Sequence, residues 1–243
     1  AVLNIGGTST ITTLTATVSP NTVNYTSTTA AQTVKATTYH HLTINKSGQI
    51  ATLGAATTVN GDLTITAGTL NLSTFTADRA TSGGTLTVSS GATLSIGGTN
   101  TIPANYATHS IGATSTINYS GASQAVGTLN SAQSYGNLTL SGSGTKTFPS
   151  GTTSIAGNLT ISAVTLDAAT NSATIEFNGS GAQTIGGATY YNLSIAKSAG
   201  SASLGAAVTV SNNVTVSSGT LTVGAFAITV TGTTTISGTL SIT

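Results

Sequence analysis

The stretch YGNLTLSGSGTKTFPSGTTSIAGNLTISAVTL, residues 135–166, contains the pattern on which the whole chain is built. The pattern recurs upstream as YHHLTINKSGQIATLGAATTVNGDLTITAGTL (39–70) and downstream as YYNLSIAKSAGSASLGAAVTVSNNVTVSSGTL (190–221). In every copy, two apolar residues that open Leu-x-Ile-like triplets are 21 positions apart: Leu42 and Leu63, Leu138 and Leu159, Leu193 and Val214. A fixed spacing of this kind is typical of a stacked repeat architecture.

Each copy is preceded by a short lead-in motif and a glutamine. The motifs TVNY, TINY and TIEF end at Tyr25, Tyr119 and Phe177, and the glutamines follow at Gln32, Gln124 and Gln183. We therefore expect one continuous repeat body over 1–243. It divides into a strand segment at 1–19, a first repeat with an extra turn at 20–112, a short second repeat at 113–171 and a third repeat with an extra turn at 172–243.

The predicted fold is all-β, with short strands in which apolar and polar residues alternate. In the triplet at 63–65, Leu63 and Ile65 should point inward and Thr64 outward, and Ala67-Gly68 should turn the chain. Spacings of 16 to 23 residues between aligned apolar positions suit one coil of a parallel β-solenoid. Roughly a dozen rungs would form a rod on the order of 50 Å long. Antiparallel β-sandwich domains are the alternative, because their strands also recur every 8 to 12 residues or so.

Composition explains the polar surface of such a rod. Hydrophobic residues make up 38% of the chain but charged residues only 4%, against roughly 25% in ordinary soluble domains. Equivalent residues on successive rungs lie about 4.8 Å apart, so a repeated charge would repel its own copy. The formal net charge of +1 provides no basic face for nucleic acid.

The residue types that are missing suggest where the protein works. The chain has no Cys, which excludes disulfides and thiolate metal sites, and no Met, although translation starts with Met. We therefore expect that an N-terminal signal segment was removed and that the protein is secreted, to the extracellular space or the cell surface. No run approaches 18 apolar residues, so no membrane-spanning helix is expected.

The titratable residues give no candidate catalytic site. Catalysis requires such groups to be gathered together, and the four carboxylates lie in unrelated parts of the repeats: Asp62, Asp78, Asp167 and Glu176. The sequence therefore predicts no enzyme and no cofactor. No metal site is expected at His40-His41 either, because neighbours on a strand point to opposite faces. Asp78 and Arg79 are expected to form a local ion pair.

Other repeated positions have structural or surface roles in this interpretation. Tyr39, Tyr135 and Tyr190 share one repeat phase and are expected to form a stacked ladder at a corner of the coil; a strip that binds sugars is the alternative. Sequons at Asn137, Asn158 and Asn192 are possible glycosylation sites. The least regular stretch, 103–110, is expected to be a protruding loop.

The two ends of the chain lie at the same phase of the repeat. Leu3-Asn4-Ile5 and Leu240-Ser241-Ile242 both correspond to Leu94-Ser95-Ile96, and neither end resembles a polar cap. We therefore expect the C-terminal end of one copy to meet the N-terminal end of another, by stacking or by strand exchange, which would propagate a fibre. The candidate interface residues are Val2, Leu3, Ile5, Ile11, Leu14, Ile236, Leu240 and Ile242. A fragment cut from a longer array would show the same phase match.

The chain resembles the β-strand repeat proteins of bacterial cell surfaces, which are related in style to autotransporter and haemagglutinin-like adhesins. The resemblance covers nearly the whole chain and lies in structural motifs such as those at 116–119, 135–140, 141–147 and 157–161. It implies a secreted parallel β-helix without an assigned activity.

Three functions are compatible with these observations. The leading hypothesis is a structural subunit of an extracellular filament, fibre or sheath whose partners are copies of itself. The second is an adhesin or adhesin stalk that binds glycans or other cell-surface material through the loop at 103–110. The third is an ice-binding solenoid, based on the Thr-x-Thr ranks at 64–66, 85–87 and 220–222, whose phases do not all align.

Overall fold

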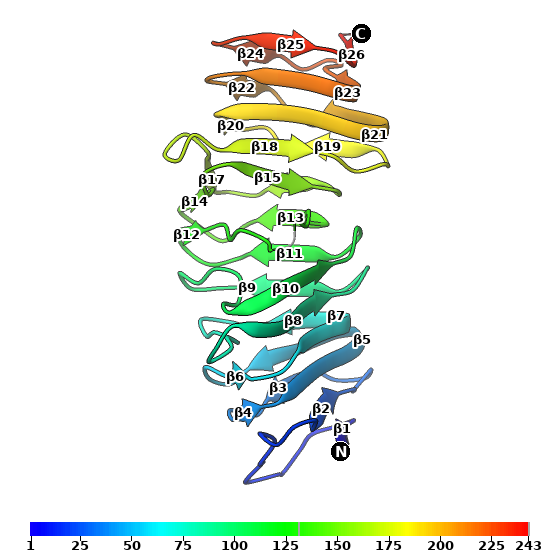
Figure 1. The fold of residues 1–243 in the computed structure, drawn as a ribbon, viewed down its shortest axis with the longest axis vertical. Coiled ribbons are helices and arrows are strands. Elements are labelled where there is room, and N and C mark those ends of the chain that lie inside the picture. Colours follow the sequence, from blue (N-terminus) through cyan, green and yellow to red (C-terminus); the bar gives the residue numbers. More distant parts are fainter. Residues whose placement is uncertain (131, 243) are drawn as a thin grey trace.

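The computed structural model describes residues 1–130 and 132–242 and shows a rod with its two termini at opposite ends (Figure 1). All paired strands of the described residues run parallel, and they stack into a β-solenoid of about 12 turns. The predicted parallel solenoid is confirmed, and the alternative of antiparallel sandwich domains is wrong. Among the described residues, no helix has the length and apolar character needed to cross a membrane.

Each turn of the solenoid contributes to three walls, which we number in the order in which the chain visits them. Wall one contains β1 (Val2–Ile5), β2 (Thr22–Tyr25), the first parts of β5 (His41–Leu53) and β7 (Leu63–Asn71), β8 (Gly83–Val88), β10 (Tyr106–Ile111), β15 (Thr152–Ile155), β18 (Thr174–Phe177), the first parts of β21 (Asn192–Leu204) and β23 (Val214–Thr222), and β25 (Thr234–Ile236).

Wall two follows wall one in every turn. It contains β3 (Gln32–Val34), the last parts of β5 and β7, β9 (Thr93–Ile96), β11 (Thr116–Tyr119), β13 (Asn137–Leu140), β16 (Leu159–Ile161), β19 (Gln183–Ile185), the last parts of β21 and β23, and β26 (Thr239–Ser241). Wall three is built from shorter strands: β4 (Thr38–Tyr39), β6 (Thr58–Val59), β12 (Gln124–Ala125), β14 (Thr145–Thr147), β17 (Thr165–Asp167), β20 (Thr189–Tyr190), β22 (Val208–Val210) and β24 (Ile228–Val230).

The alternation of residue types sets the direction of the side chains. In β7, Leu63 and Ile65 are buried while Thr64 is partly exposed, as predicted. Successive coils stack these positions in register, so that Leu63 lies beside Leu42 on one side and beside Leu86 on the other. The core is therefore a continuous column of mainly apolar side chains along the rod. The inward side chains of each coil are covered by the coils before and after it.

Corners between walls need close backbone approach. At Gly68 the backbone has a φ of +75°, and a Cβ there would lie 1.9 Å from the carbonyl oxygen of Lys46 in the preceding coil. Only glycine tolerates both the left-handed conformation and this contact. The predicted turn at Ala67-Gly68 is thereby explained.

The three sequence copies are not placed on the same walls. The lead-in strands β2 and β18 lie on wall one, whereas the equivalent β11 lies on wall two. Each lead-in strand nevertheless pairs with the same part of its own copy, since Thr22, Thr116 and Thr174 lie beside His41, Asn137 and Asn192. Copy two is therefore turned by one wall about the rod axis.

The expectation of a protruding loop at 103–110 is wrong. Residues 106–111 form β10, which pairs in parallel with β8 and buries Tyr106 and His109. The Tyr106 hydroxyl donates a hydrogen bond to the carbonyl of Ala77 in the coil below. The irregular sequence hid a strand because its inward positions hold Tyr and His in place of aliphatic residues.

Candidate functional site at the end coils

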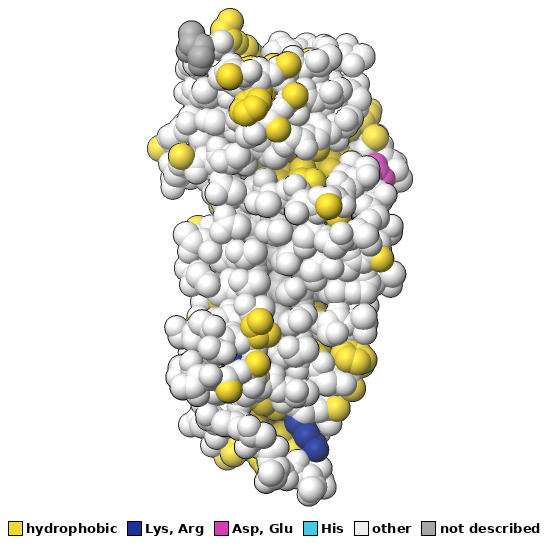
Figure 2. All heavy atoms as spheres, turned by 180° about the vertical axis from the view of Figure 1, so that it is seen from behind, with side chains coloured by type: hydrophobic (Ala, Val, Ile, Leu, Met, Phe, Trp, Pro, Cys, Tyr) yellow, Lys and Arg dark blue, Asp and Glu magenta, His cyan; other side chains and the backbone are white. Residues whose placement is uncertain are grey.

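Both ends of the rod expose apolar side chains. At the N-terminal end, Val2, Leu3 and Val18 are 67%, 37% and 63% exposed. At the C-terminal end, the exposed apolar residues are Phe226, Ile236, Leu240 and Ile242. Figure 2 shows hydrophobic atoms gathered near both ends of the molecule. These two surfaces are the candidate functional site.

The same positions are buried where they occur inside the rod. Leu94 and Ile96 of β9 are fully buried, whereas the equivalent Leu240 and Ile242 of the C-terminal coil are 40% and 71% exposed. The equivalence is structural, because β9 lies on the end of β7 as β26 lies on the end of β23. The difference is the next coil, which covers β9 but is not present over β26.

The candidate interface residues are thus divided between surface and core. Val2, Leu3, Ile236, Leu240 and Ile242 are exposed as the prediction requires, while Ile11 and Leu14 are partly buried. Ile5 is 7% exposed and belongs to the core. Leu3 and Ile5 lie two residues apart, so the pleat directs both to the same face of β1, beside the buried Val23 and Tyr25 of the next coil.

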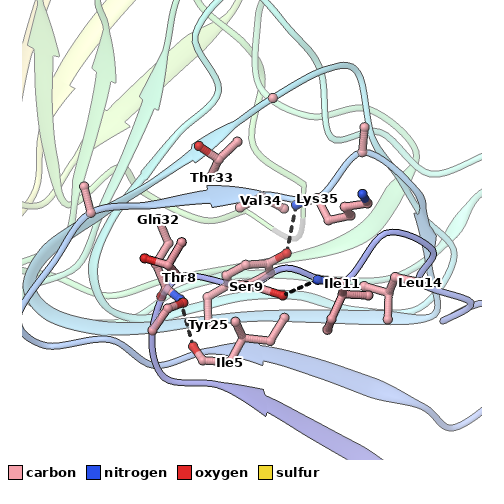
Figure 3. A pocket seen from close by; sticks show the side chains of 14 residues that line it. Ile5, Thr8, Ser9, Ile11, Leu14, Tyr25, Gln32, Thr33, Val34 and Lys35 are labelled. Carbon is pink, nitrogen blue, oxygen red and sulfur yellow. Dashed lines mark hydrogen bonds between the residues drawn. The ribbon is translucent and has the colours of Figure 1, made fainter.

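The N-terminal coil is loosely packed on wall two. A cavity of about 480 Å³ lies among Ile5, Ile11, Leu14, Tyr25 and Val34 (Figure 3). In copy two, by contrast, the residue equivalent to Ile11 is Ile102, which approaches Gly127 so closely that a Cβ there would lie 2.4 Å away. Residues 7–14 therefore follow the same path as the equivalent internal residues, 98–105, but they pack less tightly.

Three buried polar clusters, one in each copy, were missed by sequence reasoning. In copy one, the ammonium of Lys46 donates to the carbonyls of Ser27 and Ala30 and to Oε1 of Gln32, at 2.8 to 2.9 Å. Lys146 with Gln124, and Lys197 with Gln183, repeat the arrangement. All three lysines are at most 1% exposed. We call these the Lys-Gln clusters.

The glutamine of each cluster also reaches the preceding coil. The amide of Gln32 donates to the carbonyls of Ile5 and Gly7, while its Oε1 accepts from the Ser27 amide. Each cluster therefore connects three successive coils. The repeated glutamines are visible in the sequence, but their pairing with lysines was not predicted. The signal that could have indicated it is that three of the four lysines occur once in each copy.

The charge of these lysines is balanced by oxygen dipoles. Burial lowers the pKa of Lys46, Lys146 and Lys197, whereas three oxygen acceptors around each nitrogen match the three N–H bonds of an ammonium and favour the charged form. The three ammonium groups donate hydrogen bonds to backbone carbonyl oxygens and to the side-chain amide oxygens of the glutamines. The clusters are structural links between coils.

The tyrosines of the three copies are buried at corners but do not form the predicted ladder. Tyr39, Tyr135 and Tyr190 lie beside Val59, Ile155 and Val210 of the next coil. Burial raises the pKa of each hydroxyl, so all three stay neutral. With exposures of 0 to 2% they cannot form a surface strip for sugars.

Their hydroxyls bond to the lead-in aromatic residue of the same copy. The Tyr25 and Tyr39 hydroxyls are 3.2 Å apart, and those of Tyr119 and Tyr135 are 3.1 Å apart. The third copy has Phe177 in place of the first tyrosine, and Tyr190 donates only to the carbonyl of Gly186 among the bonds described.

The histidine and aspartate positions require two corrections. His40 and His41 do not point to opposite faces: their rings stack with centroids 4.2 Å apart, because His40 lies at the corner between β4 and β5. The Nδ1 of His41 accepts a hydrogen bond from the Asp62 backbone amide at 2.9 Å and lies 3.3 Å from an Asp62 carboxylate oxygen. The described residues contain no group of three or more potential metal ligands.

The predicted ion pair between Asp78 and Arg79 is also wrong, because both side chains bond to backbone. Asp78 accepts from the Ala104 amide at 2.7 Å, and Arg79 donates to the carbonyls of Thr81 and Gly61. These contacts hold the corner of one coil against the next.

The sequon asparagines take part in a ladder of side-chain acceptors. Asn137 Oδ1 accepts from the Asn158 amide, and Asn158 Oδ1 accepts from the Thr184 amide. Asn192 Oδ1 accepts from the Asn213 amide in the same way. Among the three, Asn158 is exposed and the other two are partly buried, so the ladder gives these residues a role in stacking the coils.

Comparisons with protein-family models, with curated proteins and with solved structures found no match to this chain. The class of protein that the fold defines is a parallel β-solenoid repeat protein.

Proposed function

We propose that the chain is a structural subunit of an extracellular filament, fibre or sheath, in which copies associate head to tail through their end coils. It would thus belong with the secreted, cell-surface β-strand repeat proteins that its motifs resemble. One observation carries the proposal: positions that are fully buried inside the rod are exposed in the end coils, at strand edges with a defined register.

The physical argument rests on uncovered edges. An open parallel strand edge presents unpaired N–H and C=O groups, and natural proteins cap or charge such edges to prevent association. Here the C-terminal edge carries Leu240 and Ile242 without a charged residue between 231 and 243. A contact between two different surfaces of the same molecule repeats without closing and forms a fibre.

The rest of the surface agrees with a scaffold role. The side walls carry Thr, Ser and Asn, and the chain has only nine charged residues of the Lys, Arg, Asp and Glu types. Hydrogen-bonded ladders such as Asn137 to Asn158 stabilise stacking along the axis.

Two other functions have less support. The adhesin hypothesis placed binding on a loop at 103–110, and that segment is largely the strand β10. The ice-binding hypothesis requires continuous threonine ranks on one flat wall, but Thr64 aligns with Thr87 on wall one while Thr220 and Thr222 lie on wall two.

Electron microscopy of the purified chain tests the proposal. Negative-stain images over a range of concentrations should show fibres as wide as one rod, or bundles of them, with length that increases with concentration. Isolated short rods at every concentration, together with a monomer mass in sedimentation analysis, would contradict the proposal.

A further inference from the structure

We propose that the head-to-tail contact is made by strand replacement: β1 of one copy takes the place of β26 on β23 of the next copy. This inference rests on the proposed function and specifies its geometry. The expected register is Val2 beside Thr220, Leu3 beside Leu221 and Asn4 beside Thr222.

The first argument is that β1 and β26 are two versions of one strand. Inside the rod the equivalent strand is β9, which lies between the end of β7 and the lead-in strand β11. Among the described residues, the strand paired with β26 is the lower neighbour, β23, and the strand paired with β1 is the upper neighbour, the lead-in strand β2. One strand placed between β23 and β2 would therefore reproduce the internal arrangement, and a second strand would be superfluous.

The registers of these pairs agree residue by residue. Leu94 lies beside Leu70 below and Ile117 above. Leu240 lies beside Leu221 below, and Leu3 lies beside Val23 above. Leu3 in the position of Leu240 would thus have an aliphatic neighbour in both coils, as Leu94 has.

The second argument identifies β26 as the strand that yields. It is paired over three residues, while β1 is paired over four. The C-terminal end of β1 is also held by Gln32, whose amide donates to the carbonyls of Ile5 and Gly7 at 3.0 and 2.7 Å. Displacing β26 breaks a three-residue ladder and the bond from the Val223 amide to the Ser241 carbonyl, whereas displacing β1 breaks a four-residue ladder and the bond from Gln32 to the Ile5 carbonyl.

The third argument concerns the residues that follow β1. Inside the rod, the segment after β9 covers the coil below it: Asn100 donates to the carbonyl of Phe75, and Arg79 donates its amide to the carbonyl of Ala104. The residue equivalent to Phe75 in copy three is Phe226, which is 44% exposed. Residues 6–19 of the neighbouring copy would cover it.

This coverage also explains the loose N-terminal coil. Residues 7–14 leave the cavity of Figure 3 on the side of β3 and have no coil on their other side. A neighbouring copy would supply that coil through β24 and the residues before it. We therefore expect the segment to become ordered against two coils, as residues 98–105 are.

The geometry predicts the symmetry of the filament. β1 lies on wall one and β26 on wall two. Along one copy, the path from β1 to the position of β26 therefore comprises eleven turns and one further wall. Successive copies should be related by about a third of a turn, roughly 120°, and by a rise of about 54 Å at about 4.8 Å per coil. Simple abutment, with β26 kept in place and β1 stacked on it as the next strand of wall two, would keep the third of a turn and lengthen the rise by one coil, about 4.8 Å.

Cysteine cross-linking tests the register, because the chain contains no cysteine. Asn4 and Thr222 lie at opposite ends of one molecule, so a disulfide in the N4C/T222C variant must join two copies. Residues in register on neighbouring strands have Cα atoms within the range of a disulfide. Oxidation of assembled protein should produce a ladder of covalent oligomers. The matched control is the N4C/S241C variant, which would form a disulfide only if β1 stacked on a β26 that is still in place. We expect this variant to remain unlinked.

Two deletions identify the displaced strand. Removal of 237–243 should leave assembly intact or lower the protein concentration that it requires, because β26 competes with β1 for the same position. Removal of 1–5 should abolish assembly. Circular dichroism shows whether each variant keeps the solenoid fold, and the cross-linking of full-length chains provides a readout that does not depend on the deletions.

The outcomes separate this inference from the proposed function. If no assembly forms under any condition, the filament proposal and the strand replacement both fail. If filaments form with a rise that is one coil longer, with cross-links only in N4C/S241C, or with assembly lost on removal of 237–243, the filament stands and strand replacement is wrong. A twist of one third of a turn with cross-links in N4C/T222C supports it.

Discussion

At the scale of single residues, this rod is stabilised by polar groups buried at particular corners. His109 is an example on β10: its Nδ1 accepts from the Asn130 amide at 2.8 Å, and its Nε2 is buried without a described partner. The ring is therefore held in a neutral form. Burial lowers the pKa of His109 below its ordinary value of 6.5.

This arrangement predicts that acid destabilises the rod. Because the folded pKa is lower than the unfolded one, the unfolded chain binds more protons between the two values, and the free energy of unfolding falls as the pH drops through 6.5. Above pH 6.5 the contribution of His109 is fully present. Urea unfolding between pH 5 and 7.5 should show this loss, and H109Q should reduce it. H40Q is the comparison: burial also lowers the pKa of His40, but that side chain is partly exposed, so H40Q should reduce the loss less than H109Q does. An equal reduction in the two variants would contradict the assignment.

The phenylalanine of the third copy provides a second residue-scale prediction. In copy one the Tyr25 hydroxyl accepts a hydrogen bond from the backbone amide of Lys35, and in copy two the Tyr119 hydroxyl accepts one from the amide of Gly127, both at 2.8 Å. F177Y should restore this bond at Gly186 and raise the free energy of unfolding by about 1 kcal/mol. The reverse change in copy two, Y119F, should lower it by a similar amount. Chemical denaturation measures both, and a destabilising F177Y would show that the third corner has repacked around the smaller ring.

At the scale of elements, neighbouring strands are tied together by the Lys-Gln clusters as well as by the backbone ladder. Lys146 on β14 donates to the carbonyls of Gly121 and Ala122 and to Gln124 of the preceding coil. Gln124 in turn donates to the carbonyls of Ile96 and Asn100. The cluster therefore fixes the order and spacing of three coils at the narrow corner beside wall three.

Replacing the buried lysine with an apolar residue of similar length should be costly. K146M leaves three oxygen acceptors without their donor, which should lower the free energy of unfolding by about 2 to 5 kcal/mol. The matched control is K35M, because Lys35 is partly exposed and should change stability by about 0.5 kcal/mol or less. Urea denaturation followed by circular dichroism compares the two; equal effects would show that the cluster adds no stability.

Sequence reasoning found the elements whose signal is local. Alternation at 63–65 and the glycine at 68 predicted strand, side-chain direction and corner, because each depends on one or two backbone conformations. It failed at β10, where Tyr106 and His109 occupy inward positions. It also could not pair Lys146 with Gln124, because these two residues are 22 positions apart and become neighbours only when the coil closes.

At the scale of the whole molecule, the repeat period fixes the architecture but not the number of walls. The spacing of 21 residues between Leu42 and Leu63 is one turn, and the structure shows that each turn has three sides. The rotation of copy two by one wall was hidden in the sequence, because an alignment of copies records their order and not their direction in space. Of the candidate interface residues, Leu3 and Leu240 are exposed at the ends, whereas Ile5, which shares a face of β1 with Leu3, is buried.

The burial of three lysines has a consequence for survival outside a cell. Trypsin cleaves only after lysine and arginine, and this chain has five such residues. Lys46, Lys146 and Lys197 lie sealed inside the coils, which leaves Lys35 and Arg79 as the cleavage points of the intact rod. A solenoid with so few accessible basic residues should resist digestion by trypsin without needing a disulfide.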